Sequence, residues 1–349
     1  MSARSVLSVL DPARYNIVQV GISHQGAWLG GENVLDAFEK GEHERLYPLF
    51  LSADPTRPGL FAVLGEAGQV SKVADVDVYF PVLHGTYGED GTLQGLFEMA
   101  DVAYVGAGVL GSSVGMDKAL FKDVMRANDI PVVDYITILR SDIENDMEAV
   151  VRRAESLAAY PLFVKPANLG SSVGITKCRS RSDLMEGLFE AAQYDRRILI
   201  ERGVSNPREI EISVLGNDIP QASVAGEIVP GADFYSYEAK YILDSSELNI
   251  PAALSPAQAE TIRQIALRAY KACDCYGMAR ADFLLEPDSG TIYLNEINTI
   301  PGFTRISMYP KLWQESGLAY PNLINRLVEL AFERKAERDR TVREFRRQS

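Results

Sequence analysis

The stretch MARADFLLEPDSGTIYLNEINT, residues 278–299, predicts two β-strands joined by a tight turn. Its centre, PDSG at residues 287–290, combines residues that favour turns, because proline presets φ and glycine tolerates positive φ. The flanking segments, residues 278–285 and 291–299, carry the apolar and β-branched residues typical of strands. We therefore expect an antiparallel hairpin.

The turn also predicts which residues of the hairpin face each other. Opposed residues in a hairpin have a nearly constant sum of residue numbers, here about 578 for a turn centred on PDSG. Asp282 is then opposite Glu296, and Arg280 is opposite Asn298. Because alternate residues share a face, these four side chains form one polar patch, while the apolar residues between them point to the other side.

Two facing carboxylates need compensation for their repulsion. At about 5 Å and an effective dielectric constant of about 20, Asp282 and Glu296 would repel by about 3 kcal/mol. One could become protonated, Arg280 could bridge them, or a divalent cation could bind, since carboxylate and amide oxygens are ligands that Mg²⁺ accepts. A salt bridge on a solvated sheet face is an equally good interpretation. Because Mg²⁺ completes its shell with water and phosphate, a metal here would predict a bound nucleotide.

Composition and charge limit the possible functions. The chain has 349 residues, 46% hydrophobic and 24% charged, which is typical of a folded protein of two or three domains. A formal net charge of -13 repels a nucleic-acid backbone, so no nucleic-acid partner is expected. The absence of a long apolar run and of a signal peptide predicts no membrane span. A count of three cysteines is typical of a protein whose thiols stay reduced, which indicates a reducing compartment. We therefore expect the protein in the cytoplasm.

Apolar runs that alternate with helix-period segments predict an α/β or mixed α+β architecture. Residues 15–23 and 76–84 are expected to be buried strands, and the second ends in HGTYGEDGTLQG, residues 84–95, at the kind of strand end where ligands bind. Residues 255–273 are expected to be a helix, since SPAQ at their start provides a capping box.

Several familiar motifs match but do not decide the function. GAGVLG at residues 106–111 fits a dinucleotide fingerprint, yet a domain hinge is the more economical interpretation, so a dehydrogenase is disfavoured without being excluded. GSSVG occurs at residues 111–115 and 170–174 and fits a hydrolase nucleophile elbow. All three histidines precede both serines, so the required order of serine, acid and histidine cannot occur. No glycine is followed by lysine, which excludes a Walker A loop.

Residues 163–177, FVKPANLGSSVGITK, predict a strand, a small-residue loop and a returning strand. Backbone N–H groups and serine hydroxyls of such a loop can surround an anion, and Lys165 supplies positive charge. Glycine lets the loop approach a phosphate and close over it. A flexible surface turn is the alternative, but together with the polar patch of the hairpin, phosphate binding is favoured.

Seven segments, in the same order, resemble the D-alanine:D-alanine ligases of the ATP-grasp superfamily over about residues 5–330. They are LHGTYGEDGTLQG (83–95), MDK (116–118), FVKPANLGSSVGITK (163–177), LIERGV with REIEISVLG (199–204 and 208–216), FYSYEAKY (234–241), MARADF (278–283) and NEINTIPGFT (295–304). Seven ordered matches are highly specific.

The resemblance implies an ATP-grasp fold. It implies an N-terminal parallel-sheet substrate domain (1–106), two domains that clasp ATP (107–206 and 207–340) and a charged tail (341–349). It implies a cytoplasmic enzyme, commonly a homodimer, that uses ATP and Mg²⁺ or Mn²⁺, two ions per site, to join two D-alanines for peptidoglycan. The reaction passes through an acyl phosphate and a tetrahedral intermediate, so negative charge develops in each step.

The resemblance also implies roles for individual residues. The metal ligands would be Asp282, Glu296 and Asn298. The phosphate contacts would be Lys118, Lys165, Lys240 and Ser172, and the adenine and ribose contacts Glu201, the Val204 backbone and Glu209. The tetrahedral oxyanion would contact Arg280 and the Gly302 N–H, and the second carboxylate would contact Ser307 and Met308. Ser171 and Tyr241 would close the mobile loop, and Tyr241 resembles the dipeptide-making members. His84 would lie beside the substrate, although a hydrogen-bonded loop histidine is an equal alternative.

The sequence departs from the family at its start. Members usually open with a strand, a glycine-rich turn and a Glu-His-Glu-Val-Ser segment, whereas residues 1–7 here resemble the first helix. The first strand and the glutamate expected to bind the first ammonium are therefore absent, and a start codon assigned too late would explain this. The intact mass of the native protein tests that expectation.

Two other functions stay open at this point. One is a nucleotide-binding module that has lost catalysis, and the other is an ATP-grasp ligase for a different carboxylate and amine. D-Alanine-dependent turnover discriminates both from the main prediction.

Overall fold

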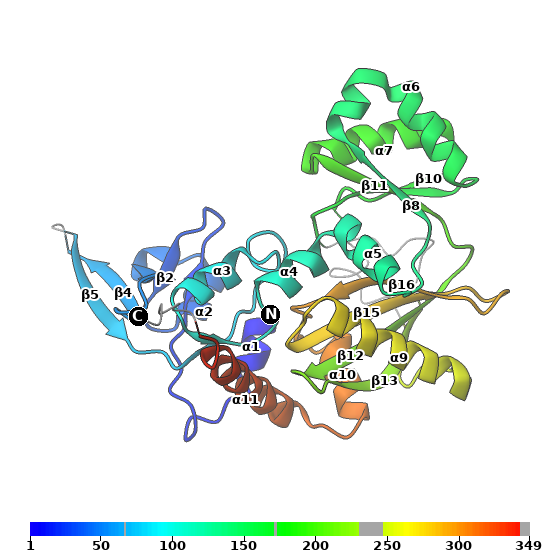
Figure 1. The fold of residues 1–349 in the computed structure, drawn as a ribbon. Helices are drawn as coiled ribbons and strands as arrows, with labels where there is room; N and C mark the ends of the chain where they lie inside the picture. Colours follow the sequence, from blue (N-terminus) through cyan, green and yellow to red (C-terminus); the bar gives the residue numbers. More distant parts are fainter. Residues whose placement is uncertain (66–67, 171–172, 230–246, 343–349) are drawn as a thin grey trace, which may run out of the picture.

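The computed structural model describes residues 1–65, 68–170, 173–229 and 247–342, in which helices pack on four β-sheets (Figure 1). This mixture confirms the expected α/β and α+β class. In Figure 1 the N-terminal region lies to one side, and two further sheets with their helices lie to the other, one above the other. Among the described residues, no helix combines the length and apolar character needed to cross a membrane.

The N-terminal region contains an antiparallel sheet and a separate parallel strand pair. The sheet has the order β1-β2-β3-β4-β5, and β6 pairs in parallel with β7. All four pairings of the first five strands are antiparallel, and the parallel pairing described in this region is that of β6 with β7. The elements are α1 (Ser2–Leu7), β1 (Gly21–Ile22), β2 (Trp28–Gly30), α2 (Val34–Lys40), the 3₁₀ helix η1 (His43–Arg45), β3 (Tyr47–Leu51), β4 (Leu60–Leu64), β5 (Gln69–Ala74), β6 (Val78–Tyr79), α3 (Thr92–Met99) and β7 (Ala103–Tyr104).

The two strands expected in this region are much shorter than their apolar runs. Of residues 15–23, only Gly21–Ile22 is a strand, and none of the residues before it is buried. Of residues 76–84, only Val78–Tyr79 pairs, and the proline two residues further has no N–H to continue the ladder. The prediction of two buried strands is therefore wrong over most of its length, because an apolar run forms a strand only where a neighbouring backbone pairs with it.

The stretch 106–111, interpreted above as a domain hinge, is partly helical. Residues 109–111 begin α4 (Val109–Met116), whereas residues 106–108 lie outside any helix. A Cβ atom on Gly111 would lie 2.8 Å from the carbonyl oxygen of Asp274, and one on Gly115 would lie 3.2 Å from Cγ2 of Thr299. These glycines therefore allow close packing of α4 against the C-terminal region.

The central sheet, in the order β10-β9-β11-β8, has one apolar and one polar face. Val164, Ile198 and Ile200 belong to a core shared with α6 and α7. The neighbouring positions in the strand pairing, Lys165 and Glu201 among them, point to the opposite face, where α5 lies. The elements are α5 (Lys118–Ala127), β8 (Tyr135–Leu139), α6 (Arg140–Leu157), β9 (Leu162–Pro166), β10 (Thr176–Cys178), α7 (Arg181–Tyr194) and β11 (Arg197–Arg202).

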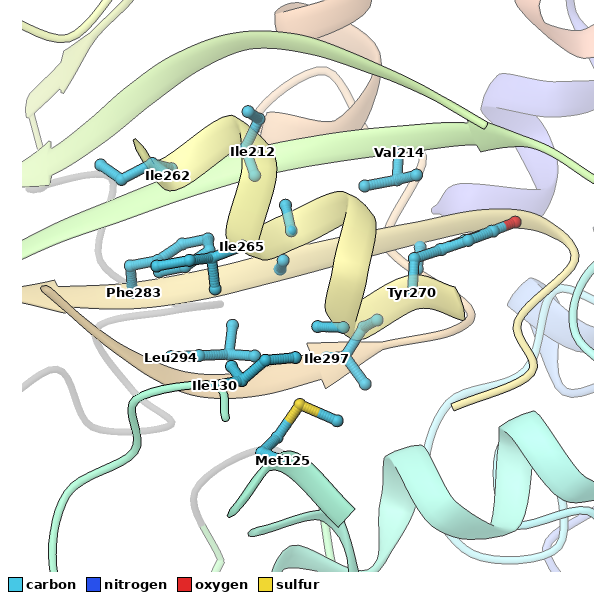
Figure 2. Close-up of a cluster of buried hydrophobic side chains, with 14 of the residues drawn as sticks. Met125, Ile130, Ile212, Val214, Ile262, Ile265, Tyr270, Phe283, Leu294 and Ile297 are labelled. Carbon is cyan, nitrogen blue, oxygen red and sulfur yellow. The ribbon is translucent and has the colours of Figure 1, made fainter. Parts of the chain in front are cut away.

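The C-terminal sheet, in the order β14-β13-β12-β15-β16, contains the largest described core. Helix α9 packs on one face of it, as Figure 2 shows, and begins with the predicted capping box at Ser255 and Gln258. The elements are β12 (Arg208–Gly216), β13 (Gln221–Val229), β14 (Glu247–Asn249), α9 (Pro256–Ala272), β15 (Gly277–Leu285), β16 (Ile292–Asn298), α10 (Met308–Glu315) and α11 (Tyr320–Asp339).

Helix α11 connects the two ends of the chain. Val6 of α1 shares a buried cluster with Leu323, Leu327 and other residues of α11. Near the far end of α11, two arginines form ion pairs with acidic residues of the N-terminal region, at N···O distances of 2.5–2.9 Å. These pairs are Arg334–Glu98, Arg338–Glu98 and Arg338–Asp101. Helix α11 therefore packs against the N-terminal region and forms ion pairs with it (Figure 1).

Candidate active site

The hairpin of β15 and β16 has the predicted register. Asp282 pairs with Glu296, and Arg280 pairs with Asn298. Directly after Asp282 the register shifts by one residue, which marks a β-bulge. Bulges re-aim side chains and are frequent beside functional sites. The four polar residues therefore lie together as the sequence predicted.

The two faces of the hairpin also agree with the prediction. The apolar residues of β15 are buried against α9: Ala279, Ala281 and Phe283. Arg280 and Asp282 are half-buried on the other face. Strand β12 extends that face, because Glu211 pairs with Asp282 and Glu209 pairs with Leu284. The polar face thus spans three adjacent strands.

Arg280 is held by two carboxylates. Its Nε and Nη2 donate to Oδ1 and Oδ2 of Asp282 at 2.7 and 2.6 Å, and its Nε lies 2.9 Å from Oε2 of Glu211. Burial would lower the pKa of the guanidinium, but the attraction of Asp282 and Glu211 outweighs burial and raises the pKa well above its usual value. Arg280 is therefore a fixed positive charge, with its planar group oriented by the bidentate pair.

The residues of the patch fit a divalent cation. Glu296 also acts electrostatically on Arg280, so three carboxylates lie around one guanidinium. Asn298 is oriented by its side-chain oxygen, which accepts a hydrogen bond from the Ile300 N–H at 3.0 Å. Within the described residues, no group of three or more His, Cys, Asp and Glu side chains is arranged to hold a metal. A metal would therefore depend on Asp282, Glu296 and the Asn298 amide, oxygen donors that suit Mg²⁺ or Mn²⁺.

A second charged cluster lies on the polar face of the central sheet. Lys122 Nζ lies 3.0 Å from Oε1 of Glu201, and Lys165 Nζ lies 2.5 Å from Oε2. Burial would raise the pKa of the Glu201 carboxyl, but the attraction of the two ammonium groups outweighs burial and lowers the pKa to about 2. Burial lowers the pKa of Lys122, and Glu201 partly offsets that effect. Glu201 is therefore ionised at neutral pH.

The glycine-serine loop between β9 and β10 is approached from two sides. Lys118, in the first turn of α5, donates from Nζ to the carbonyl oxygen of Leu169 at 2.5 Å. A Cβ atom on Gly170 would lie 3.8 Å from Oε2 of Glu89 and 3.8 Å from Cα of Gly85. The loop that follows β6 and the glycine-serine loop of the central sheet therefore meet.

His84 lies in the loop that follows β6. Its side chain is 38% exposed, and Nδ1 lies 3.9 Å from Oε1 of Glu89. Glu89 is itself buried and accepts a hydrogen bond from the Gly85 N–H. His84 is thus at an accessible position next to the glycine-serine loop.

The segment after β16 places Gly302 beside Ser307. A Cβ atom on Gly302 would lie 2.7 Å from the Ser307 hydroxyl, so this approach requires glycine. The Ser307 hydroxyl accepts from the Thr304 N–H at 3.0 Å, and Ser307 is the N-cap residue of α10. The Met308 side chain is buried against Ile228, so only its backbone N–H, in the first turn of α10, is available for a carboxylate.

The remaining residues predicted to contact the nucleotide lie on or next to the connection between the two sheets. Val204 lies two residues after the end of β11 and is 8% exposed, and Glu209 is half-buried near the start of β12. The two sheets also contact each other, since Arg202 donates to the Tyr293 hydroxyl at 3.0 Å. Four predicted residues lie outside the described part of the chain: Ser171, Ser172, Lys240 and Tyr241.

Two residues of these clusters were not predicted, Lys122 and Glu211. Lys122 follows Lys118 by four residues, a spacing that puts both on one side of α5, and this was a usable signal. Glu211 follows Glu209 by two residues in β12, which is the spacing of one strand face. The alternation of the two glutamates could therefore have identified it.

The comparisons with known proteins agree on one family. The family model "D-ala D-ala ligase N-terminus" matches residues 1–107, and "D-ala D-ala ligase C-terminus" matches residues 124–329. A D-alanine–D-alanine ligase from Heliobacterium modesticaldum is 48% identical over 343 residues, which cover 98% of this chain and 93% of that protein.

Solved structures agree with the sequence relatives. The D-alanine–D-alanine ligase from Coxiella burnetii is 37% identical with a TM-score of 0.81, over 97% of this chain and 90% of that chain. The VanG D-Ala:D-Ser ligase from Enterococcus faecalis is 33% identical with a TM-score of 0.83, over 95% of this chain and 94% of that chain. With two family models spanning most of the sequence and a relative 48% identical over 98% of it, this chain belongs to the D-alanine–D-alanine ligase family.

Proposed function

We propose that this protein is an ATP-dependent ligase that joins two D-alanine molecules into D-alanyl-D-alanine for peptidoglycan. The observation that carries the proposal is the polar face of the C-terminal sheet, where Asp282 is paired with Glu296 and Arg280 with Asn298. Family membership supports the same activity, since the relatives are named for it.

The nucleotide site is proposed between the central and C-terminal sheets. Glu201 and the Val204 backbone would contact adenine, and Glu209 would accept both ribose hydroxyls. The phosphates would contact Lys118, Lys165, Lys240 and Ser172. The position of Lys118 on the backbone of the glycine-serine loop supports this assignment, because a phosphate enclosed by that loop would lie within its reach.

Asp282, Glu296 and Asn298 would hold two Mg²⁺ or Mn²⁺ ions. Bound there, the ions would neutralise phosphate charge and align the transferred group. The three carboxylates that act on Arg280 support the assignment, because carboxylate oxygens are ligands that favour a hard cation.

The proposed reaction has two steps. The carboxylate of the first D-alanine attacks the γ-phosphoryl group of ATP, which gives an acyl phosphate and ADP. The amine of the second D-alanine then attacks the acyl carbon, loses a proton, and phosphate leaves from the tetrahedral intermediate. Arg280 and the Gly302 N–H would stabilise the oxyanion of that intermediate, because both donors are fixed before the charge develops.

The D-alanine subsites are proposed from the remaining residues. Ser307 and the Met308 N–H would bind the carboxylate of the second D-alanine at the first turn of α10, where backbone N–H groups lack partners within the helix. His84 would lie beside the substrate, and contact between Ser171 and Tyr241 would close the glycine-serine loop.

The wider setting is proposed from the family. It comprises a cytoplasmic homodimer whose chain divides into a substrate domain (1–106), two ATP-clasping domains (107–206 and 207–340) and a charged tail (341–349). The three described cysteines, all buried and unbridged, are compatible with a reducing compartment.

Phosphate release from ATP, measured against D-alanine concentration, tests the proposal. We expect release that requires D-alanine, with one dipeptide formed per phosphate, as measured by mass spectrometry. D-Serine and D-lactate are tested in parallel, because a solved neighbour is named a D-Ala:D-Ser ligase. ATP binding without D-alanine-dependent release would contradict the proposal and leave a nucleotide-binding module. A clear preference for another acceptor would change the substrate and keep the ligase.

A further inference from the structure

Lys122 is a lysine with almost no exposure to solvent, and no step of the proposed reaction uses it. Its side chain is 1% exposed, against 4% for Glu201 and 12% for Lys165. Its ammonium is 3.0 Å from one oxygen of Glu201, while Lys165 is 2.5 Å from the other oxygen. One buried carboxylate is thus bound by two ammonium groups that come from different elements, α5 and β9.

The two lysines differ in their freedom to leave Glu201. Lys122 lies inside α5, and its ammonium is 5.9 Å from the centroid of the Tyr135 ring, so its surroundings are protein on all sides. Lys165 is the penultimate residue of β9, where the chain runs toward the glycine-serine loop. Only Lys165 can therefore turn toward a ligand at that loop while its partner stays in place.

Resting on the proposed function, we propose that Lys122 is a positioning residue. It keeps the Glu201 carboxylate paired, so that Lys165 can move from Glu201 to a phosphate of the bound nucleotide. A buried carboxylate that loses its partner cation is strongly destabilised. Without Lys122, Glu201 therefore retains Lys165, and the contact between Lys165 and the phosphate is weakened.

The pairing of Glu201 supports this role. While Lys122 neutralises one oxygen of Glu201, Lys165 can leave the other oxygen without stranding a buried charge. The negative charge of Glu296 also acts on Lys122. Lys122 acts on the nucleotide only through Glu201 and Lys165, and this separates its role from a direct phosphate contact.

Binding of ATP and of adenosine to the full-length protein tests the inference. Lys122→Met should weaken ATP binding by about ten- to hundredfold, the size expected for a charge-assisted hydrogen bond, and should change adenosine binding less than about threefold. A general loss of structure would weaken both ligands alike. Calorimetry or competition titration gives both affinities, and thermal unfolding checks the fold.

A double-mutant cycle separates an action through Glu201 from a direct one. In a Glu201→Gln background the carboxylate no longer retains Lys165, so adding Lys122→Met should change ATP affinity less than about threefold. Arg126→Met is the matched control. Arg126 is also a cation of α5, and its guanidinium carbon lies 4.0 Å from the centroid of the Tyr135 ring. It pairs with Asp134 and not with Glu201.

Each outcome decides the inference. Unchanged ATP affinity in Lys122→Met, or an equal loss in the Glu201→Gln background, overturns the role of Lys122 while wild-type ATP binding keeps the proposed function intact. A wild-type protein that binds no ATP overturns both. If Lys122→Met does not fold, the double variant Lys122→Met/Glu201→Gln takes its place, because it lacks both buried charges. Its ATP affinity is compared with that of Glu201→Gln.

Discussion

The two charged clusters of the site have opposite compositions. Glu201 lies between two cations, Lys122 and Lys165, whereas Arg280 lies between two carboxylates, Glu211 and Asp282. Cations outnumber carboxylates in the first cluster, and carboxylates outnumber cations in the second, where Glu296 also acts on Arg280. Cations suit the phosphates of a metal nucleotide, and carboxylates suit its metal.

This difference indicates a division of labour. The cluster around Glu201 should govern how tightly the nucleotide phosphates bind, and the cluster around Arg280 should govern the metal and the chemical step. Substitutions in the two clusters should therefore affect different kinetic parameters. The first two experiments below test the cluster around Arg280, and the third tests the charge of the cluster around Glu201.

The largest effect is expected for Glu296→Ala. We expect a loss of Mg²⁺-dependent turnover of about 10³-fold, because a metal ligand and one negative charge are removed together. Phosphate release measured against Mg²⁺ concentration checks this, and thermal unfolding should show a retained fold. Glu286→Ala, a carboxylate at the turn of the same hairpin, should remain active. Near-normal activity of Glu296→Ala would disprove the metal assignment.

A smaller effect is expected for Glu211→Gln. Arg280 keeps its bidentate pair with Asp282 but loses its second charged partner, so kcat should fall about tenfold while KM for ATP stays nearly constant. Steady-state kinetics with varied ATP distinguish the two parameters. The control is Glu227→Gln, which breaks a carboxylate–arginine pair of the same sheet, with Arg208. A rise in KM for ATP with kcat unchanged would contradict the division of labour.

The third prediction concerns stability in acid and leaves the kinetics aside. The pKa of the Glu201 carboxyl is lowered from its usual 4.5 to about 2, so its ionisation stabilises the fold above about pH 4.5, and this contribution is lost as the pH falls toward 2. Glu201→Gln should lack this part of the acid sensitivity, which amounts to up to about 3 kcal/mol. Urea unfolding at several pH values between 2 and 6 provides the comparison. Identical pH profiles for both proteins would show that the cluster does not depress the pKa.

The hairpin could be predicted from the sequence because its determinants are local. The PDSG turn sets the register, alternation sets the faces, and both were confirmed for Arg280, Asp282, Glu296 and Asn298. The helix beginning at Ser255 was predictable for the same reason, since a capping box lies within one turn.

The rest of the site depends on contacts that a linear pattern does not encode. The pairing of Lys122 with Glu201 joins α5 to β11, and charge alone does not tell which lysine reaches which carboxylate. The strands expected over residues 15–23 and 76–84 failed because strand formation required partners that the apolar pattern could not supply. The fold class followed from the pattern, whereas long-range pairing did not.

The packing of α11 against α1 and α3 has a consequence for biosynthesis. Arg334 and Arg338 emerge from the ribosome more than two hundred residues after Glu98 and Asp101, with which they pair. The segment made first therefore lacks these partners until α11 has been translated. Slow synthesis would prolong that exposed interval and increase the demand for chaperones.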